Sequence, residues 1–317
     1  MDSAISDRFD TSRFEAGRDR LASLAYRMLG SASDAEDAVQ DAFLRWQAAD
    51  RERIGVPEAW LTKVVTNLCL DRLRSARARH ERAVGAWLPE PLLEGDPMLG
   101  PADTFEQRES VSLAVLTLME RLSPLERAAY VLREAFSYSH AEIAGILGIT
   151  ESASQQHVHR ARTRIAAERR RGGETDRASA RRVVEEFLAA AASGRTERLV
   201  ALLTDDVTAF SDGAGLARRL LRYHTPGQVA SHVRAGFKPT PAKRRLAGGT
   251  PAFHFALVNG SPAAVAVVGD RILGVMAFEV RDGKVASLRG IAAASRLRRL
   301  DEAWRRHEPD APAIAAW

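Results

Sequence analysis

The spacing of apolar residues changes near Leu203, and this change limits the folds open to the chain. Up to that point apolar residues recur every three or four positions, as in amphipathic helices. Beyond it they form short or alternating runs such as "FHFALV" and "AAVAVV", which are typical of strands. We therefore expect helices first and then an α+β domain with an antiparallel sheet. Asp282 and Gly283, between two such runs, predict a hairpin turn.

The helical half divides at a segment rich in proline and apolar residues. Gly30 and "SASD" separate a first helix from a second, and Pro57 suits the start of a third. Helical spacing resumes in "SVSLAVLTLMERL", after which Ser123 can cap a further helix. We predict four parts: a helical domain over 10–84, an apolar linker over 85–103, a second helical domain over 104–171 and the α+β domain over 176–317.

Length and composition restrict the number of domains, the cellular compartment and the partners that we expect for this chain. A length of 317 residues predicts two or three compact units. The single cysteine, Cys69, excludes an internal disulfide framework and a cysteine-rich metal site. With neither a signal peptide nor an apolar run long enough to span a membrane, the sequence predicts a cytoplasmic protein without a membrane partner, metal or cofactor. A net charge of +5 is weak support for a polyanionic partner.

The linker opens with "GAWLPEPL". Two prolines in this stretch disfavour a regular helix or a central strand, so the segment should run extended. Trp87, Leu88 and Leu92 are nevertheless side chains that a solvated linker seldom carries. We expect the linker to dock on an apolar surface of another part of the chain.

The stretch "SHAEIAGILGITESASQQHVHRARTRI" has the pattern of a helix-turn-helix. Ser139 and Glu142 have the spacing of a capping box, Gly148 supplies the turn, and Thr150 can cap the second helix. The outer face of that helix offers amide and basic groups that suit base edges and phosphates in a major groove: Gln155, Gln156, His159, Arg160 and Arg162. The alternative is an ordinary helical hairpin with a basic solvent face.

A second block makes the interpretation more specific. "LAYRMLGSASDAEDAVQDAFLRW" and "PEAWLTKVVTNLCLDRLRSARAR" resemble region 2 of the extracytoplasmic-function (ECF) sigma factors, and the helix-turn-helix block resembles their region 4. The resemblance spans roughly residues 14 to 168, and both blocks occur in the order of that family. It implies a partner in core RNA polymerase, through the β′ clamp helices and the β flap, and a second partner in promoter DNA.

The resemblance also assigns residues to each contact. Polymerase binding falls by position on an acidic helix, at Asp37, Gln40 and Asp41. Capture of the −10 element falls on the third helix, at Asn67, Asp71, Arg72, Arg74 and Arg77. Recognition of the −35 element falls on the residues named above for the second helix of the helix-turn-helix. Ser154 departs from the family pattern, which usually has an aliphatic residue there.

The C-terminal part resembles the SnoaL-like, nuclear-transport-factor-like cone fold. Sigma factors fused to such a domain carry a "WLPEPL" linker, which implies a regulatory contact through Trp87, Leu88, Pro89, Pro91 and Leu92. Their "DGGGK" is "DGAGL" here, retaining Asp212, Gly213 and Gly215 but replacing the lysine by Leu216. Their "NPDKL" is "AASRL" here, so we expect the interactions of those side chains to be absent.

Other classes of function stay open at this point. His224, His232 and His254, with Asp206 and Asp212, are the candidates for acid-base catalysis, although their spacing defines no constellation and we expect no enzyme. An unidentified small ligand in the C-terminal domain is a further candidate partner. A one-component regulator that binds DNA without polymerase and senses a ligand is the alternative function, and it would have no use for the acidic face.

Overall fold

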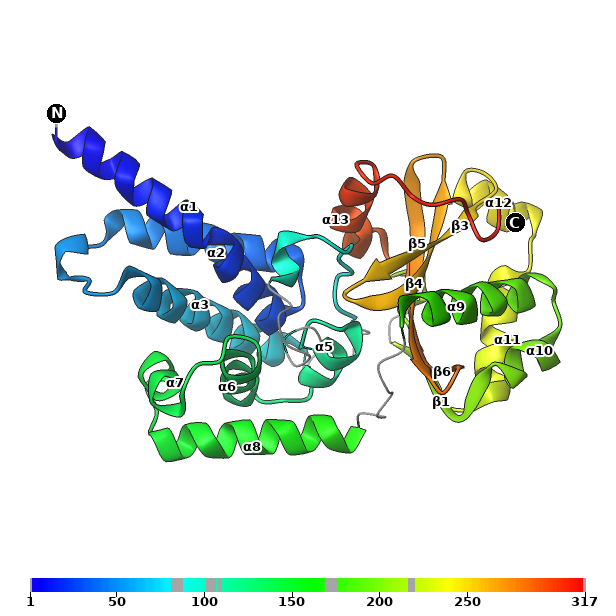
Figure 1. The fold of residues 1–317 in the computed structure, drawn as a ribbon, viewed down its shortest axis with the longest axis horizontal. Helices are drawn as coiled ribbons and strands as arrows, with labels where there is room; N and C mark the ends of the chain where they lie inside the picture. The colour runs from blue at the N-terminus through cyan, green and yellow to red at the C-terminus, as the bar shows by residue number, and fades with distance from the viewer. Residues whose placement is uncertain are drawn as a thin grey trace. The chain divides into compact units, whose positions relative to one another are not determined.

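The computed structural model describes residues 2–80, 88–100, 107, 110–168, 176–215 and 220–315, with side chains left out at 2–13, 76–80, 168 and 215. The chain forms two compact units (Figure 1). One unit is helical and contains residues 1–83 and 95–168. The other contains residues 84–94 and 169–317, so the linker divides between Glu94 and Gly95. Both predicted helical domains fall in the first unit.

Three helices open the helical unit: α1 (Asp2–Leu29), α2 (Ala32–Ala48) and α3 (Pro57–His80). Gly30 has a φ of 67° and ends α1, and the Ser31 hydroxyl accepts a hydrogen bond from Asp34 N to cap α2. The predicted helix boundaries at "GSASD" and Pro57 are therefore confirmed. The short 3-10 helices η1 (Arg51–Arg53) and η2 (Pro97–Leu99) lie in the loops of this unit.

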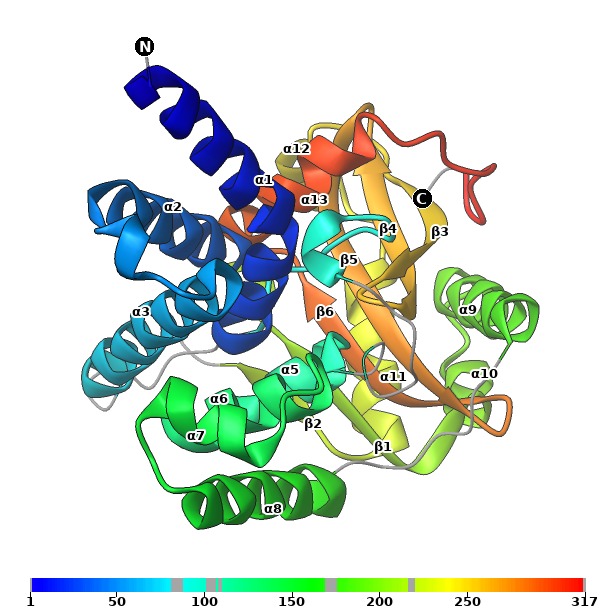
Figure 2. The ribbon, with the colours of Figure 1, turned by 60° about the vertical axis from the view of Figure 1, so that its left-hand side comes forward.

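The helices described after these are α5 (Leu113–Met119), α6 (Pro124–Glu134), α7 (His140–Leu147) and α8 (Glu151–Glu168). Ser123 caps α6 as predicted, and Glu126 completes a reciprocal capping box with it. The predicted capping box at Ser139 and Glu142 begins α7. In Figure 2, α8 runs along one side of α6 and α7.

A buried arginine connects the two halves of the helical unit. Arg27 of α1 is 1% exposed and donates to Ser23 Oγ, to Ser110 Oγ at 3.0 Å and to the Leu99 carbonyl at 2.8 Å. Its guanidinium also stacks over the Phe136 ring at 5.6 Å. Burial lowers the pKa of Arg27 to about 10, so the group stays charged at neutral pH and its hydrogen bonds hold it in place.

The second unit combines helices with a six-stranded sheet. Its helices are α9 (Arg177–Ala192), α10 (Thr196–Ala201), α11 (Pro226–Phe237), α12 (Pro241–Ala247) and α13 (Ala294–Trp304), with a 3-10 turn η3 (Gly213–Gly215). Its strands are β1 (Leu203–Ser211), β2 (Leu221–Tyr223), β3 (Ala252–Val258), β4 (Ser261–Val268), β5 (Arg271–Arg281) and β6 (Lys284–Ile291). The sheet order is β2-β1-β6-β5-β4-β3.

The structure refines the expected α+β architecture in two respects. The expectation of an antiparallel sheet is wrong for one pair, because β1 runs parallel to β6. A parallel pair needs a long connection, and here α11, α12 and four strands (β2 to β5) lie between its members in the sequence. The apolar pattern does not predict strand β2 or helices α11 and α12. The hairpin at Asp282 and Gly283 is confirmed, with φ values of 52° and 72°.

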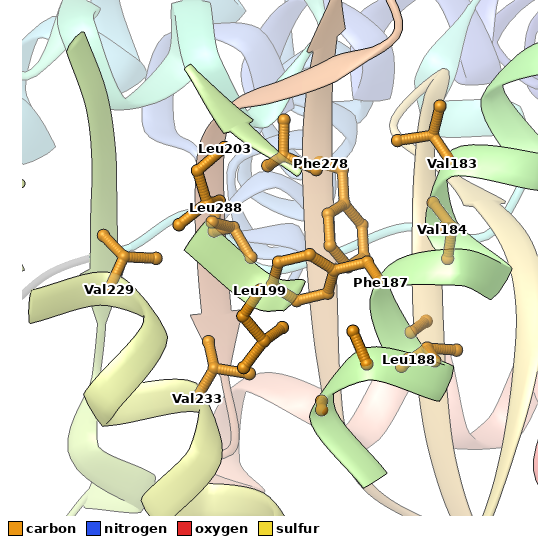
Figure 3. Packing of buried hydrophobic residues seen from close by; sticks show 14 of the residues in the cluster. Val183, Val184, Phe187, Leu188, Leu199, Leu203, Val229, Val233, Phe278 and Leu288 are labelled. Carbon is orange, nitrogen blue, oxygen red and sulfur yellow. The ribbon is translucent and has the colours of Figure 1, made fainter. Parts of the chain in front are cut away.

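The core of the second unit lies between one face of the sheet and helices α9, α10 and α11 (Figure 3). Phe187 of α9 meets Phe278 of β5 edge to face, with ring centroids 5.3 Å apart. Leu199, Val229 and Leu288 pack around this pair. Figure 1 shows α13 on the opposite face of the sheet, so helices cover the sheet on both sides.

Strand β3 is an edge strand whose two ends are covered by distant parts of the chain. Ile314 pairs with Phe253, with Phe253 N donating to the Ile314 carbonyl at 2.9 Å. Leu93 forms a second bridge, to Val258. Edge strands expose unpaired backbone groups, so these two segments protect β3 from pairing with other chains.

Gly100 provides a test of the packing around Arg27. Its φ is 68°, and a Cβ at this position would collide with Ser23 Oγ. We expect Gly100→Ala to lower the free energy of unfolding of the helical unit by about 2–4 kcal/mol, from backbone strain and overpacking together. Urea unfolding of the full chain measures it. Gly95→Ala is the control, because Gly95 also has a positive φ but faces open space; an equal loss in both variants would contradict the packing argument.

Candidate functional site

The acidic face predicted on α2 is present on the surface. Asp37 and Gln40 are exposed, Asp41 is partly exposed, and the three lie within one helical turn, while Ala38 and Val39 between them are buried. Arg72 of α3 reaches this face, donating to Asp41 Oδ2 at 2.8 Å and lying 3.9 Å from Asp37 Oδ2. The acidic face therefore includes one cation contributed by the neighbouring helix.

The residues assigned to −10 capture lie along α3 with different partners. Asp71 and Arg74 are exposed and pair with each other at 3.3 Å, whereas Asn67 is half-buried. Arg72 points to α2 instead, where it also donates to the Asp34 carbonyl at 2.8 Å. Arg77 lies on α3, but its side chain is outside the described residues.

Helices α7 and α8 form the expected helix-turn-helix geometry. Gly148 ends α7 in the left-handed conformation, and Ala153 N donates to Thr150 Oγ1 at the start of α8. Ser154 is fully buried between the helices, where its hydroxyl lies 3.1 Å from His140 Nδ1 of α7. This hydrogen bond explains how a polar residue occupies a position where apolar packing was expected.

The outer face of α8 separates into exposed polar groups and ion-paired groups. Gln155, Gln156 and His159 are exposed in the first half of the helix. The arginines that follow form bonds within the domain: Arg160 Nε donates to Glu126 Oε1 at 3.1 Å, Arg164 Nη1 to Glu126 Oε2 at 2.7 Å, and Arg162 Nε to Glu134 Oε1 at 3.0 Å. Arg160 and Arg162 thus hold α8 on α6 as well as facing solvent.

Glu126 is a site residue that the sequence analysis missed. Its side chain is 5% exposed, and it accepts hydrogen bonds from Ser123 N, Arg160 and Arg164. Burial alone would raise the pKa of this carboxyl, but the bonds from Ser123 and the nearby arginines lower it below its ordinary value of 4.5. One carboxylate therefore caps α6 and fixes the orientation of α8.

The first part of the linker, up to Glu94, belongs to the second unit. Leu88 and Leu92 are 0% exposed, and Pro89 and Pro91 are buried beside them. Leu92 N donates to Asn259 Oδ1 at 2.8 Å, and Asn259 N donates to the Leu92 carbonyl at 2.9 Å. Glu94 N donates to the Leu257 carbonyl at 3.0 Å, which continues the pairing with β3. Trp87 lies outside the described residues.

Of the two other motifs of the C-terminal part, one fixes the start of α13 and the other contacts the linker. The buried Asp212 carboxylate accepts hydrogen bonds from the Ala292 and Ala293 amides at 2.9–3.0 Å, which fixes the start of α13. Arg296, in the first turn of α13, donates to the Leu88 carbonyl. The expected absence of interactions at "AASRL" is thus wrong for Arg296, because a long guanidinium reaches a backbone oxygen. Gly213 and Gly215 lie in η3, directly after Asp212.

The acid-base candidates have separate partners in the described part of the second unit. Burial lowers the pKa of His232, whose Nδ1 lies 2.9 Å from the Tyr223 hydroxyl. His254 contacts the Asp310 carbonyl and the Trp304 ring, Asp206 pairs with Arg281, and His224 is exposed. Asp212 is occupied by backbone amides. Among the residues whose structure is described, no group of three or more potential metal ligands occurs.

Comparison with known proteins identifies the family of the two helical regions. Residues 14–79 match the family Sigma-70 region 2, and residues 112–165 match Sigma-70, region 4. Two such regions in this order, the second containing a helix-turn-helix, define a sigma factor. The chain is 38% identical to the ECF RNA polymerase sigma factor SigJ of Mycobacterium tuberculosis over 89% of its length and 91% of SigJ. This chain belongs to the ECF RNA polymerase sigma factors.

The similarity extends through the C-terminal unit. The probable ECF RNA polymerase sigma factor SigI of M. tuberculosis is 32% identical over 90% of this chain and 94% of that protein. The crystal structure of SigJ superposes with a TM-score of 0.67 at 35% identity, covering 91% of this chain and 98% of SigJ. The expected fold class, helical sigma regions followed by a SnoaL-like α+β domain, is confirmed. In the part of the chain described, no helix is both long and apolar enough to cross a membrane.

Glu126→Gln tests the link between α6 and α8. At pH 7 we expect a loss of about 1.5–3 kcal/mol in the free energy of unfolding, because two arginines lose a charged acceptor. The folded-state pKa of Glu126 is lowered, so its contribution is present above pH 4.5 and is lost as the pH falls through the lowered value. Unfolding at pH 7 and pH 3 should therefore show a difference that shrinks in acid. Glu151→Gln, at an exposed carboxylate of α8, is the control for removal of a surface charge; a pH-independent loss in Glu126→Gln would contradict the assignment.

Proposed function

We propose that the protein is an alternative sigma factor that binds core RNA polymerase and directs promoter-specific initiation in the cytoplasm. The observation that carries the proposal is the presence of two separate solvent-facing surfaces in one helical unit, the acidic face of α2 and the outer face of α8. A one-component regulator would need the α8 face but would have no use for the α2 face.

The charges of the two surfaces support different partners. Asp37 and Asp41 would repel DNA phosphates, so this face suits a basic protein surface such as the polymerase clamp helices. Gln155, Gln156 and His159 lie at the N-terminal part of the second helix, from which such motifs contact base edges, and we assign them to the −35 element. Asn67, Asp71 and Arg74 of α3 remain our candidates for the −10 element, and Arg77 follows them on the same helix.

The linker contact supports a regulatory role for the C-terminal unit. The segment from Leu88 to Glu94 lies between regions 2 and 4 in the sequence. The site at which it docks therefore restricts the positions that these two regions can take. Burial of Leu88 and Leu92 stabilises the docked state by about 1.5–3 kcal/mol for each side chain before ordering costs. We propose that release or retention of this segment, fixed by Asn259 and Arg296, sets the activity of the sigma regions.

Charge reversal tests polymerase binding. Asp37→Arg combined with Asp41→Arg should reduce affinity for core polymerase at least tenfold. The free energy of unfolding should fall by only about 1 kcal/mol, because the lost ion pairs with Arg72 lie at aspartates that are 72% and 47% exposed. The same protein should fail to start transcripts from a matched promoter. Glu58→Arg, at an exposed acidic residue of α3, is the control. Unchanged core binding by the double variant, together with DNA binding as a dimer on a palindrome, would favour the one-component alternative.

Asn259→Gly tests the contact between the linker and the β3–β4 hairpin without disrupting the turn in which Asn259 lies. Asn259 has a φ of 51°, which glycine adopts readily, so the turn should survive while the Oδ1 acceptor for Leu92 N is removed. We expect faster hydrogen exchange at Leu92 N and a change in transcription activity in the same direction as that caused by Leu92→Ala. The two changes should be non-additive when combined, because they act on one contact. Additive effects would show that the contact does not control activity.

A further inference from the structure

The charge of the chain is divided unevenly between its two units. In the helical unit, acidic residues outnumber basic ones, so the net charge of +5 arises entirely in the C-terminal unit. This unit contains a long stretch without any aspartate or glutamate, from Gly213 to Gly269. The same stretch carries basic residues at 218, 219, 222, 234, 238, 243, 244 and 245. A sigma region that must approach DNA therefore has an unfavourable net charge of its own, and the attached unit has the opposite charge.

Four of the described basic residues of this stretch, Lys238, Lys243, Arg244 and Arg245, lie where α11 ends and α12 begins. Lys243 Nζ donates to the carbonyls of Ala235, Gly236 and Lys238, which fixes α12 against the C-terminal end of α11. Helix α12 has no buried residue; its Arg244 and Arg245 are exposed, as is Lys238 just before it. Lysines and arginines close to one another, without an acidic residue in the stretch, create a positive potential.

The turn between β4 and β5 brings further charged residues to this surface: Asp270, which is acidic and 81% exposed, and Arg271, the first residue of β5. Arg271 donates to the Ala247 carbonyl at the end of α12. On the other side of the turn, Arg305 lies 3.6 Å from Asp270, which places the end of α13 and the exposed Arg306 near the same turn. We call this surface the α12 basic surface and define it by Lys238, Lys243, Arg244, Arg245, Arg271 and Arg306.

We infer that the α12 basic surface binds the phosphate backbone of duplex DNA without reading its sequence. The inference rests on the proposed function in one respect, namely that the protein works on DNA, and adds a contact outside regions 2 and 4. Flexible point charges on exposed side chains suit phosphates rather than base edges. An anionic membrane is the less suitable partner, because Leu246 is the one large apolar side chain exposed on α12.

The salt dependence of DNA binding tests the inference. The full chain, without polymerase, is titrated with a fluorescent duplex of unrelated sequence over a range of salt concentrations. The variant replaces Lys238, Arg245 and Arg306 by Gln, three exposed residues of the surface. Log affinity falls as log salt rises, and each phosphate interaction that is removed should make this slope less steep by about 0.9. We therefore expect the magnitude of the slope to decrease by about 2 to 3 in the triple variant. Affinity for specific and unrelated duplexes should fall by the same factor.

A matched control removes the same charge elsewhere in the unit. Arg182, Arg195 and Lys284 are exposed but lie outside this surface, and Gln at all three should leave the slope close to that of the unaltered chain. An unchanged slope in the first variant, or an equal reduction in both, would overturn the inference. So would an unchanged slope combined with weaker binding of the first variant to vesicles containing phosphatidylserine, which would identify a lipid surface instead.

Core binding separates failure of this inference from failure of the proposed function. Both Gln variants should bind core polymerase as tightly as the unaltered chain, because the acidic face of α2 is untouched. If the unaltered chain neither binds core polymerase nor starts transcripts, the proposed function fails whatever the slopes show. If it does both and the slopes do not differ, the inference about the α12 basic surface alone fails.

Discussion

The backbone pairing between the linker and strand β3 is the interaction on which the C-terminal unit and its link to the sigma regions depend. β3 is an edge strand, and its outer backbone groups need partners. Leu93 and Ile314, far apart in the sequence, supply them at the two ends of the strand. The linker is thus a structural part of a domain from which it is separated by the whole of region 4.

The organisation of the chain was largely predictable, because it follows from local patterns. Helical spacing, capping residues and the Asp-Gly turn identified most elements, and two motif blocks identified the family. The parallel pairing of β1 with β6 was not predictable from those patterns, since it depends on contacts between residues far apart in sequence. Helix α11 was missed because its few apolar positions, Val229, Ala230 and Val233, give a weaker signal than the strand-like runs that follow it in the sequence.

Several site residues were missed for a similar reason. Arg27 and Glu126 appear in the sequence as one arginine and one glutamate among many, and their importance comes from burial against partners that only the fold brings together. Asn259 did have a local signal, because Asn-Gly favours a two-residue hairpin turn. Its second role, as acceptor for Leu92 N, could not be read from that signal. The same holds for Arg296, which lies in a motif that differs from the family pattern and whose side chain nevertheless contacts the linker.

The separation in sequence between Leu92 and Asn259 affects the order of events as the chain is made. Their contact spans 167 residues, and synthesis proceeds at roughly 5–20 residues per second. About 10 to 30 s therefore pass between the appearance of the linker and that of the hairpin that binds it. In the later part of this interval, once region 4 has been made, the nascent chain presents both sigma regions with an undocked linker. Each newly made molecule therefore passes through a brief period in which its linker cannot yet dock on the C-terminal unit.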